Sequence, residues 1–108
     1  MLIKITKTYR DVVAICDKEL LWKRFEEGEF QLDVKESFFK GDETDEDKAV
    51  GIMKLMSIED STFNIVGEKS VNTAVKAGII LNSQIRKIQG VPFAMVLMWL
   101  ENLLNFFL

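Results

Sequence analysis

Alternating apolar and polar positions at the start of the chain predict a β-hairpin. Ile3 and Ile5 alternate with polar neighbours in residues 2–7, and residues 12–16 form an apolar, mostly β-branched run. The polar residues 9–11 separate the two runs. Two short strands around a polar break are typical of a hairpin.

The next segment has the spacing of a short helix. Asp17 is placed to cap it, Leu21, Trp22 and Phe25 fall on one face, and Gly28 follows where a helix would stop. We therefore expect a helix of about ten residues, held by packing because an isolated helix of that length is marginal.

A third strand is predicted at residues 30–34, because Phe30, Leu32 and Val34 alternate with polar residues and so share one face. Residues 35–41 follow neither period, since two phenylalanines stand side by side at 38–39.

The clearest helical period in the chain lies after residue 44. Thr44 and Asp47 have the spacing of a capping box, and the acidic residues 45–47 suit the positive end of a helix dipole. The apolar positions follow at i, i+3, i+4 and i+7, namely Ala49, Ile52, Met53 and Met56. This pattern predicts the second helix.

The following segments predict a strand, a third helix and further strands. Residues 62–66 have a strand pattern that ends at Gly67, and a helix is expected from 68 to 77 with Gly78 as its stop. The helix carries an apolar stripe of Val71, Ala74 and Val75. Residues 79–81 and 85–98 supply the remaining strand material, interrupted by Asn82-Ser83-Gln84 and by Gly90-Val91-Pro92.

These elements predict an α+β fold, a two-layer α/β sandwich with a single, mainly antiparallel sheet and about three helices. One domain is expected over residues 1–98, since no linker composition divides the chain. Residues 99–108 are expected to form a separate apolar helical tail.

The tail is the most apolar part of the chain. Residues 91–108 carry one charge, Glu101, but Pro92, Asn102 and Asn105 argue against a membrane span. A helical stripe consists of Leu100, Leu103, Leu104, Phe107 and Leu108. We expect this stripe to form a homo-oligomer contact; the alternatives are packing on its own domain and on a membrane surface, the last disfavoured because its polar face lacks Lys and Arg.

Composition removes several function classes. A net charge of −3 argues against a protein whose main task is neutralising phosphates, although Lys4, Lys7, Arg10, Arg86 and Lys87 could form a local basic patch. Cys16 is the single cysteine, so no internal disulfide forms, and with no secretory signal we expect a cytoplasmic protein. The absence of histidine excludes His-based zinc sites and Cys-His or Ser-His catalysis within one chain.

Three places in the sequence are candidate chemical sites. Cys16 before Asp17 could be an activated thiol at a helix start, but without a histidine we expect a buried cysteine and a helix cap. Gly67 could present amides to an anion, yet one glycine beside Glu68 favours a capped structural turn. The acidic residues 42–47 lack calcium-loop spacing and indicate a solvated loop. No catalytic residue, metal site or cofactor is predicted.

Five segments occur together in a familiar order. They are Ala14–Leu21, Phe25–Gly28, Leu32–Val34, Asn64–Glu68 and Gly90–Pro92. In this order they resemble the archaeal family called domain of unknown function 424, over roughly residues 3–95. The resemblance implies a cytoplasmic archaeal protein with a compact two-layer α/β sandwich and no assigned enzymatic activity.

The chain departs from that family after the proline. Relatives continue with His-Ala-Gln, whereas this chain has Phe93-Ala94-Met95. A shared site would therefore rest on backbone groups and on Asp17, Asn64 and Glu68.

The functional hypothesis is a non-enzymatic binding or assembly module, accessory to translation or RNA handling, that self-associates through its tail. The competing hypothesis is a small-ligand protein or an enzyme that uses the turns at Asn64–Glu68 and Gly90–Pro92. The candidate binding residues common to both are Asp17, Asn64, Gly67, Glu68, Gly90 and Pro92.

Overall fold

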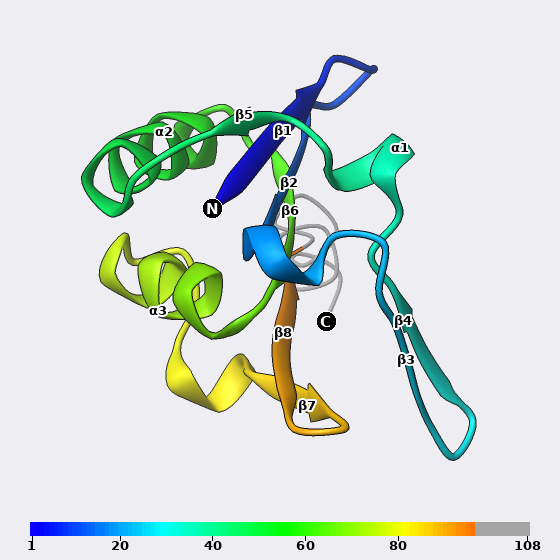
Figure 1. Cartoon of the computed structure of the whole chain (residues 1–108). Helices are drawn as coiled ribbons and strands as arrows, with labels where there is room; N and C mark the ends of the chain where they lie inside the picture. Colours follow the sequence, from blue (N-terminus) through cyan, green and yellow to red (C-terminus); the bar gives the residue numbers. More distant parts are fainter. Residues whose placement is uncertain (97–108) are drawn as a thin grey trace.

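A six-stranded sheet forms the centre of the protein, in a computed structural model that describes residues 1–96 (Figure 1). Its strands, in spatial order, are β5 (Asp42–Glu43), β1 (Leu2–Thr6), β2 (Val12–Cys16), β6 (Thr62–Val66), β8 (Val91–Val96) and β7 (Arg86–Ile88). Only the β2–β6 pair among them is parallel. The predicted hairpin of β1 and β2 and the mainly antiparallel sheet are confirmed.

Two strands form a sheet of their own, which contradicts the prediction of a single sheet. β3 (Arg24–Glu27) and β4 (Phe30–Asp33) pair only with each other in the described chain, and their hairpin projects from the body (Figure 1). Gly28, at φ 61°, opens the two-residue turn between them, a conformation that glycine adopts without steric cost.

The helix predicted over residues 17–28 is wrong. Only a 3-10 turn, η1 (Lys18–Leu20), forms there, and the predicted stop Gly28 is instead the hairpin turn. Trp22, at φ 73°, breaks the helical path. Phe25 lies opposite Leu32 in the hairpin, and both side chains pack on the sheet, which satisfies their apolar surface without a helix.

Helices occupy both sides of the sheet. α2 (Glu46–Ile58) and α3 (Glu68–Lys76) cover one face, and the single turn α1 (Glu36–Phe39) lies with the β3–β4 hairpin on the other side (Figure 1). Residues 1–96 contain three α-helices, as many as predicted, although α1 lies where no helix was expected and two of the predicted helices, α2 and α3, are confirmed. The predicted stop at Gly78 has φ 77°, as the left-handed end of a helix requires.

The start of α2 differs from the predicted capping box. Asp45, not Thr44, is the cap, and its Oδ1 accepts a hydrogen bond of 2.8 Å from the Lys48 amide. The cap thus lies one residue later than predicted. Asp45 and Lys48 are separated by three positions, as are Thr44 and Asp47, so spacing alone did not distinguish the two possible caps.

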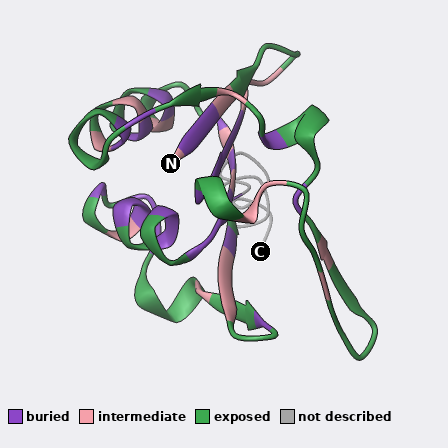
Figure 2. Ribbon diagram, viewed as in Figure 1, coloured by how far each residue is buried: buried purple, intermediate pink, exposed green. Residues whose placement is uncertain are grey.

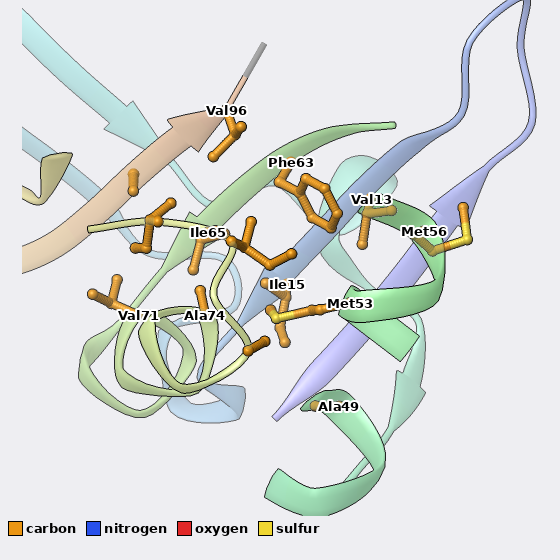
Figure 3. Close-up of a cluster of buried hydrophobic side chains, with 14 of the residues drawn as sticks. Val13, Ile15, Ala49, Met53, Met56, Phe63, Ile65, Val71, Ala74 and Val96 are labelled. Atoms are coloured by element: carbon orange, nitrogen blue, oxygen red, sulfur yellow. The ribbon is translucent and has the colours of Figure 1, made fainter. Parts of the chain in front are cut away.

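Two apolar clusters of the described residues lie on opposite faces of the sheet. The buried residues concentrate on the central strands and on the two long helices (Figure 2). The larger cluster joins β2, β6 and β8 to the two long helices (Figure 3), and its buried residues include Val13, Ile15, Ala49, Met53, Met56, Phe63, Ile65, Val71, Ala74 and Val96. The smaller one includes Leu2, Ala14, Cys16, Val34, Phe39 and Val66. Adjacent β6 residues Ile65 and Val66 belong to different clusters because successive strand side chains alternate between faces.

The end of the described chain differs from the prediction in two details. Residues 79–81 are not a strand; Ile79 and Ile80 are buried without strand pairing, and η2 (Asn82–Gln84) follows. The interruption near Gly90 is a two-residue turn in which Gln89 and Gly90 have φ values of 49° and 78°. Pro92 lies inside β8, opposite Lys87 and outside the register with β6, so its missing amide disrupts no ladder bond to β6.

The predicted tail at 99–108, with its contact residues and the boundary at residue 98, lies outside the described residues. Within residues 1–96, no helix has the length and apolar character needed to cross a membrane.

Candidate functional site

Asp17 is the centre of the site that the sequence predicted. It directly follows β2, and its backbone amide donates to the Val66 carbonyl at 3.0 Å, which places its side chain beside the start of α3. The carboxylate is only 4% exposed. Oδ1 accepts hydrogen bonds from the amide and hydroxyl of Ser70, both at 2.8 Å, and Oδ2 accepts one from the Lys69 amide at 3.1 Å. Asp17 therefore caps α3 rather than a helix of its own.

Gly67 allows this approach. It precedes α3 with φ 108° and ψ 155°, and it has no side chain that could cap the helix. A Cβ at this position would lie 2.6 and 2.7 Å from the two carboxylate oxygens of Asp17, closer than real Cβ atoms come to any neighbour. The anion position at this helix start is thus filled by the protein's own carboxylate.

The two predicted turns meet. The Gly67 amide donates to the Pro92 carbonyl at 2.8 Å. A pocket of about 240 Å³ adjoins this contact and is lined by Glu68, Val71, Asn72, Ile85, Lys87, Gly90 and Pro92. Three of the predicted residues therefore line one pocket, whereas Asn64 lies in mid-strand, opposite Ala14 and Met95, and lines none of it.

Cys16 has no access to solvent. Burial, and next the negative charge of Asp17, raise the pKa of its thiol from 9.0 to about 11. A thiol with that pKa stays protonated at neutral pH and is a poor nucleophile. Within residues 1–96, no cluster of three Asp, Glu or Cys side chains is arranged to hold a metal ion.

Trp22 is the exposed residue that the sequence prediction misplaced. Its side chain is 66% exposed, and its indole Nε1 donates to Glu36 Oε2 at 3.0 Å. The Lys40 Nζ lies 6.0 Å from the ring centroid, within cation–π range. The hydrogen bonds to Trp22 and then Lys40 lower the pKa of Glu36, which keeps this carboxylate charged. Periodicity could not predict that the Trp22 ring is exposed, because its position also fits the apolar face of a helix.

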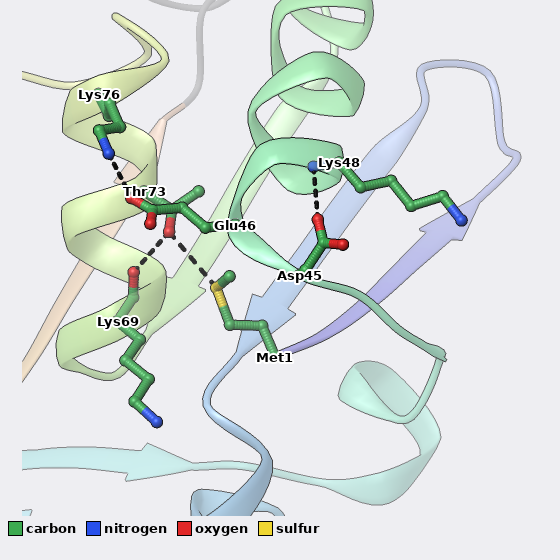
Figure 4. A network of polar contacts seen from close by, with 7 residues as sticks. All are labelled: Met1, Asp45, Glu46, Lys48, Lys69, Thr73 and Lys76. Carbon is green, nitrogen blue, oxygen red and sulfur yellow. Dashed lines mark hydrogen bonds and ion pairs between the residues drawn. The ribbon is translucent and has the colours of Figure 1, made fainter.

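A second polar cluster joins the chain start to the two long helices (Figure 4). The Thr73 hydroxyl lies 2.7 Å from the Lys69 carbonyl and 3.4 Å from the Met1 sulfur. Lys76 and Glu46 form an ion pair of 2.9 Å between α3 and α2. These contacts position the helices, and a pocket of about 360 Å³ lies beside Met1, Asp45 and Thr73.

Residues 5–98 match the sequence profile of a family described as a protein of unknown function (DUF424). The chain belongs to this family. A solved relative of this DUF424 protein is an uncharacterized conserved protein from Methanopyrus kandleri, with 26% sequence identity and a TM-score of 0.77 over 88% of each chain. No curated protein matches this chain.

Proposed function

We propose that this DUF424 protein is a non-catalytic binding module that contacts RNA through Trp22 and associates with copies of itself through residues 99–108. The observation that carries the RNA contact is the exposed indole on a backbone with φ 73°. A bulky residue in this region costs on the order of 1–3 kcal/mol and persists only where its surroundings over-determine it.

The surroundings of Trp22 hold that conformation. Its amide donates to the Val34 carbonyl at 2.8 Å, and the Val34 amide donates to the Lys23 carbonyl at 2.9 Å. These bonds fix the backbone on both sides of the connection, and the cation near the ring is Lys40, whose Nζ lies 6.0 Å from the ring centroid. An exposed aromatic ring beside a cation suits a nucleobase, because stacking of a base on such a ring contributes roughly 1–3 kcal/mol.

Fluorescence tests this contact directly. The chain has two tryptophans, Trp22 and Trp99, so a Trp99→Phe variant reports on Trp22 alone. Adding a mixed-sequence single-stranded RNA should quench that emission, and Trp22→Ala should weaken RNA binding at least ten-fold. Tyr9→Ala is the matched control, since Tyr9 is an exposed aromatic residue at the β1–β2 turn. An equal loss of RNA affinity in Trp22→Ala and Tyr9→Ala, or no quenching of the Trp22 emission, would refute the contact.

Self-association is supported by the composition of the tail. Its five apolar stripe residues, Leu100, Leu103, Leu104, Phe107 and Leu108, could each contribute roughly 1.5–3 kcal/mol when buried, before ordering and association are subtracted. Light scattering should find an oligomer for the full chain and a monomer after deletion of residues 99–108. A monomeric full chain, or an unchanged mass after deletion, would refute it.

The pocket between the two turns supports the competing hypothesis of a small-ligand protein or an enzyme. Glu68, Lys87 and Asn72 offer charged and amide groups around it. A screen of the purified full chain for bound RNA, protein and metabolites separates the hypotheses. If the chain co-purifies with a metabolite but no RNA, and Glu68→Ala loses that metabolite, the result would favour the small-ligand or enzyme hypothesis.

A further inference from the structure

A further pocket lies between the β3–β4 hairpin and the β7–β8 strands. Its volume is about 390 Å³, and we call it the hairpin pocket; it is lined by Glu27, Phe30, Arg86, Lys87, Ile88 and Phe93. Arg86 lies opposite Phe93, so these two side chains share one face of the sheet with Ile88. The Phe30 side chain, at the end of the hairpin, is 75% exposed.

The hairpin pocket is held open by Gln89. The backbone amide of Gln89 donates to Glu27 Oε1 at 3.1 Å, and the side-chain Oε1 of Gln89 accepts a hydrogen bond from the backbone amide of Glu26 at 3.3 Å. These two bonds fasten β3 to the β7–β8 turn. The pocket is therefore organised before any partner arrives, which lowers the ordering cost of binding.

The chemistry of the hairpin pocket defines its occupant. Phenylalanine and isoleucine side chains form its walls, and two cations and one carboxylate, that of Glu27, lie beside them, so its lining has one net positive charge. Arg86 Nη1 donates to the Ser83 carbonyl at 3.1 Å, which leaves other guanidinium donors available. A complementary segment is apolar and carries one negative charge. Residues 97–108 have this composition, since Glu101 is their single charge.

The direction of β8 favours the segment of a second copy. Phe93 lines the pocket, and Val96 lies three residues further along the strand, about 10 Å away at ~3.3 Å per residue. To return to its own pocket, the chain would have to reverse the direction of β8 within residues 97–108. Residues 97–108 contain no glycine or proline, the residues that best permit such a reversal.

We propose that the hairpin pocket of one copy receives residues 97–108 of a second copy, with Glu101 paired to Arg86 and apolar side chains against Phe30 and Phe93. This inference rests on the self-association proposed above. Reciprocal exchange of the two segments would close a symmetric dimer, the commonest assembly of identical chains.

The test compares full-length variants by sedimentation equilibrium. Phe30→Asp and Arg86→Glu should each raise the dimer dissociation constant at least ten-fold. Leu55→Asp is the matched control, because Leu55 is also exposed, at 60%, but lies on α2 outside the pocket. The double variant Arg86→Glu/Glu101→Arg should regain most of the lost affinity, since the charges are exchanged.

The outcomes separate this inference from the self-association itself. If deletion of residues 99–108 gives a monomer while Phe30→Asp and Arg86→Glu remain dimeric, self-association stands and the hairpin pocket is refuted as its receptor. If the charge exchange fails to restore affinity, the Glu101–Arg86 pairing is refuted. A monomeric full chain refutes both proposals.

Discussion

At the scale of single residues, Asp17 and Gly67 form one structural unit although fifty positions separate them in the sequence. Gly67 occupies the cap position of α3 without a side chain, and the Asp17 carboxylate supplies the missing acceptor from the end of β2. The unit also joins two neighbouring parallel strands, so the cap stabilises a long-range arrangement as well as a helix end.

Asp17→Ala should therefore be costly. It removes three hydrogen bonds and leaves the Lys69 and Ser70 amides without their acceptor, which should lower the free energy of unfolding by roughly 2–3 kcal/mol in urea titration. Asp17→Asn keeps one acceptor oxygen and should lose less. A loss below ~0.5 kcal/mol for alanine would contradict the role of this cap.

Gly67→Ala provides the matched test of the same unit. In the wild-type background its Cβ meets the Asp17 carboxylate and its φ of 108° is strained for alanine. In the Asp17→Ala background only the φ strain remains, so the same substitution should cost less. Equal costs in the two backgrounds would show that the two residues do not interact.

Cys16 predicts a specific dependence of stability on pH. Since the folded pKa is raised from 9.0 to about 11, the folded protein holds this proton more tightly than the unfolded chain does. The corresponding stability is present below pH 9 and is lost as the pH rises towards 11. Denaturation between pH 8 and 11 should show this decline, and Cys16→Ala should reduce it. A thiol that reacts readily with a disulfide reagent in the folded protein at pH 8 would contradict the buried, protonated state.

At the scale of elements, the β3–β4 hairpin replaces the predicted helix because cross-strand contacts outweigh a local spacing. Phe25 and Leu32 face each other and pack on the smaller core cluster. The hairpin has few partners of its own beyond that contact and the Gln89 bonds. A two-stranded hairpin is marginal without such support.

Gln89→Asn should loosen the hairpin while leaving the main sheet intact. Asparagine tolerates the φ of 49° but is one methylene shorter, so the bond to the Glu26 amide is lost. Hydrogen exchange should accelerate in residues 24–33 and remain unchanged in β2 and β6. Gln84→Asn is the control, because Gln84 also accepts a backbone bond, from Leu81, away from the hairpin. Unchanged exchange in the hairpin would show that Gln89 does not hold it.

At the scale of the whole molecule, one sheet serves two cores. The helix-covered cluster contains Ile65, and the opposite cluster contains its neighbour Val66, so loss of β6 would expose both. The two clusters should therefore unfold together, as small single domains usually do.

Ile65→Val and Val66→Ala test this coupling from the two faces. Each removes buried methyl groups and should lower the free energy of unfolding by roughly 0.5–3 kcal/mol. Thermal transitions followed by circular dichroism and by tryptophan fluorescence should stay coincident in both variants. A second transition in Val66→Ala alone would show that the smaller cluster and the hairpin unfold separately.

Elements whose signals are local could be predicted from the sequence. The β1–β2 hairpin, the apolar stripe of α2, and the passage from β6 through Gly67 into α3 follow from periodicity and from residues at element ends, which act over three or four positions. Membership of the family likewise followed from the order of short segments. The path of residues 17–28, the helix that Asp17 caps and the exposure of Trp22 could not be predicted in this way, because they depend on tertiary contacts. Those features depend on contacts with Leu32, Val34 and Ser70, which lie seven to fifty-three positions from their partners, beyond the three or four positions over which helical periodicity acts. A ten-residue apolar pattern is too short to choose between helix and hairpin before those partners are in place.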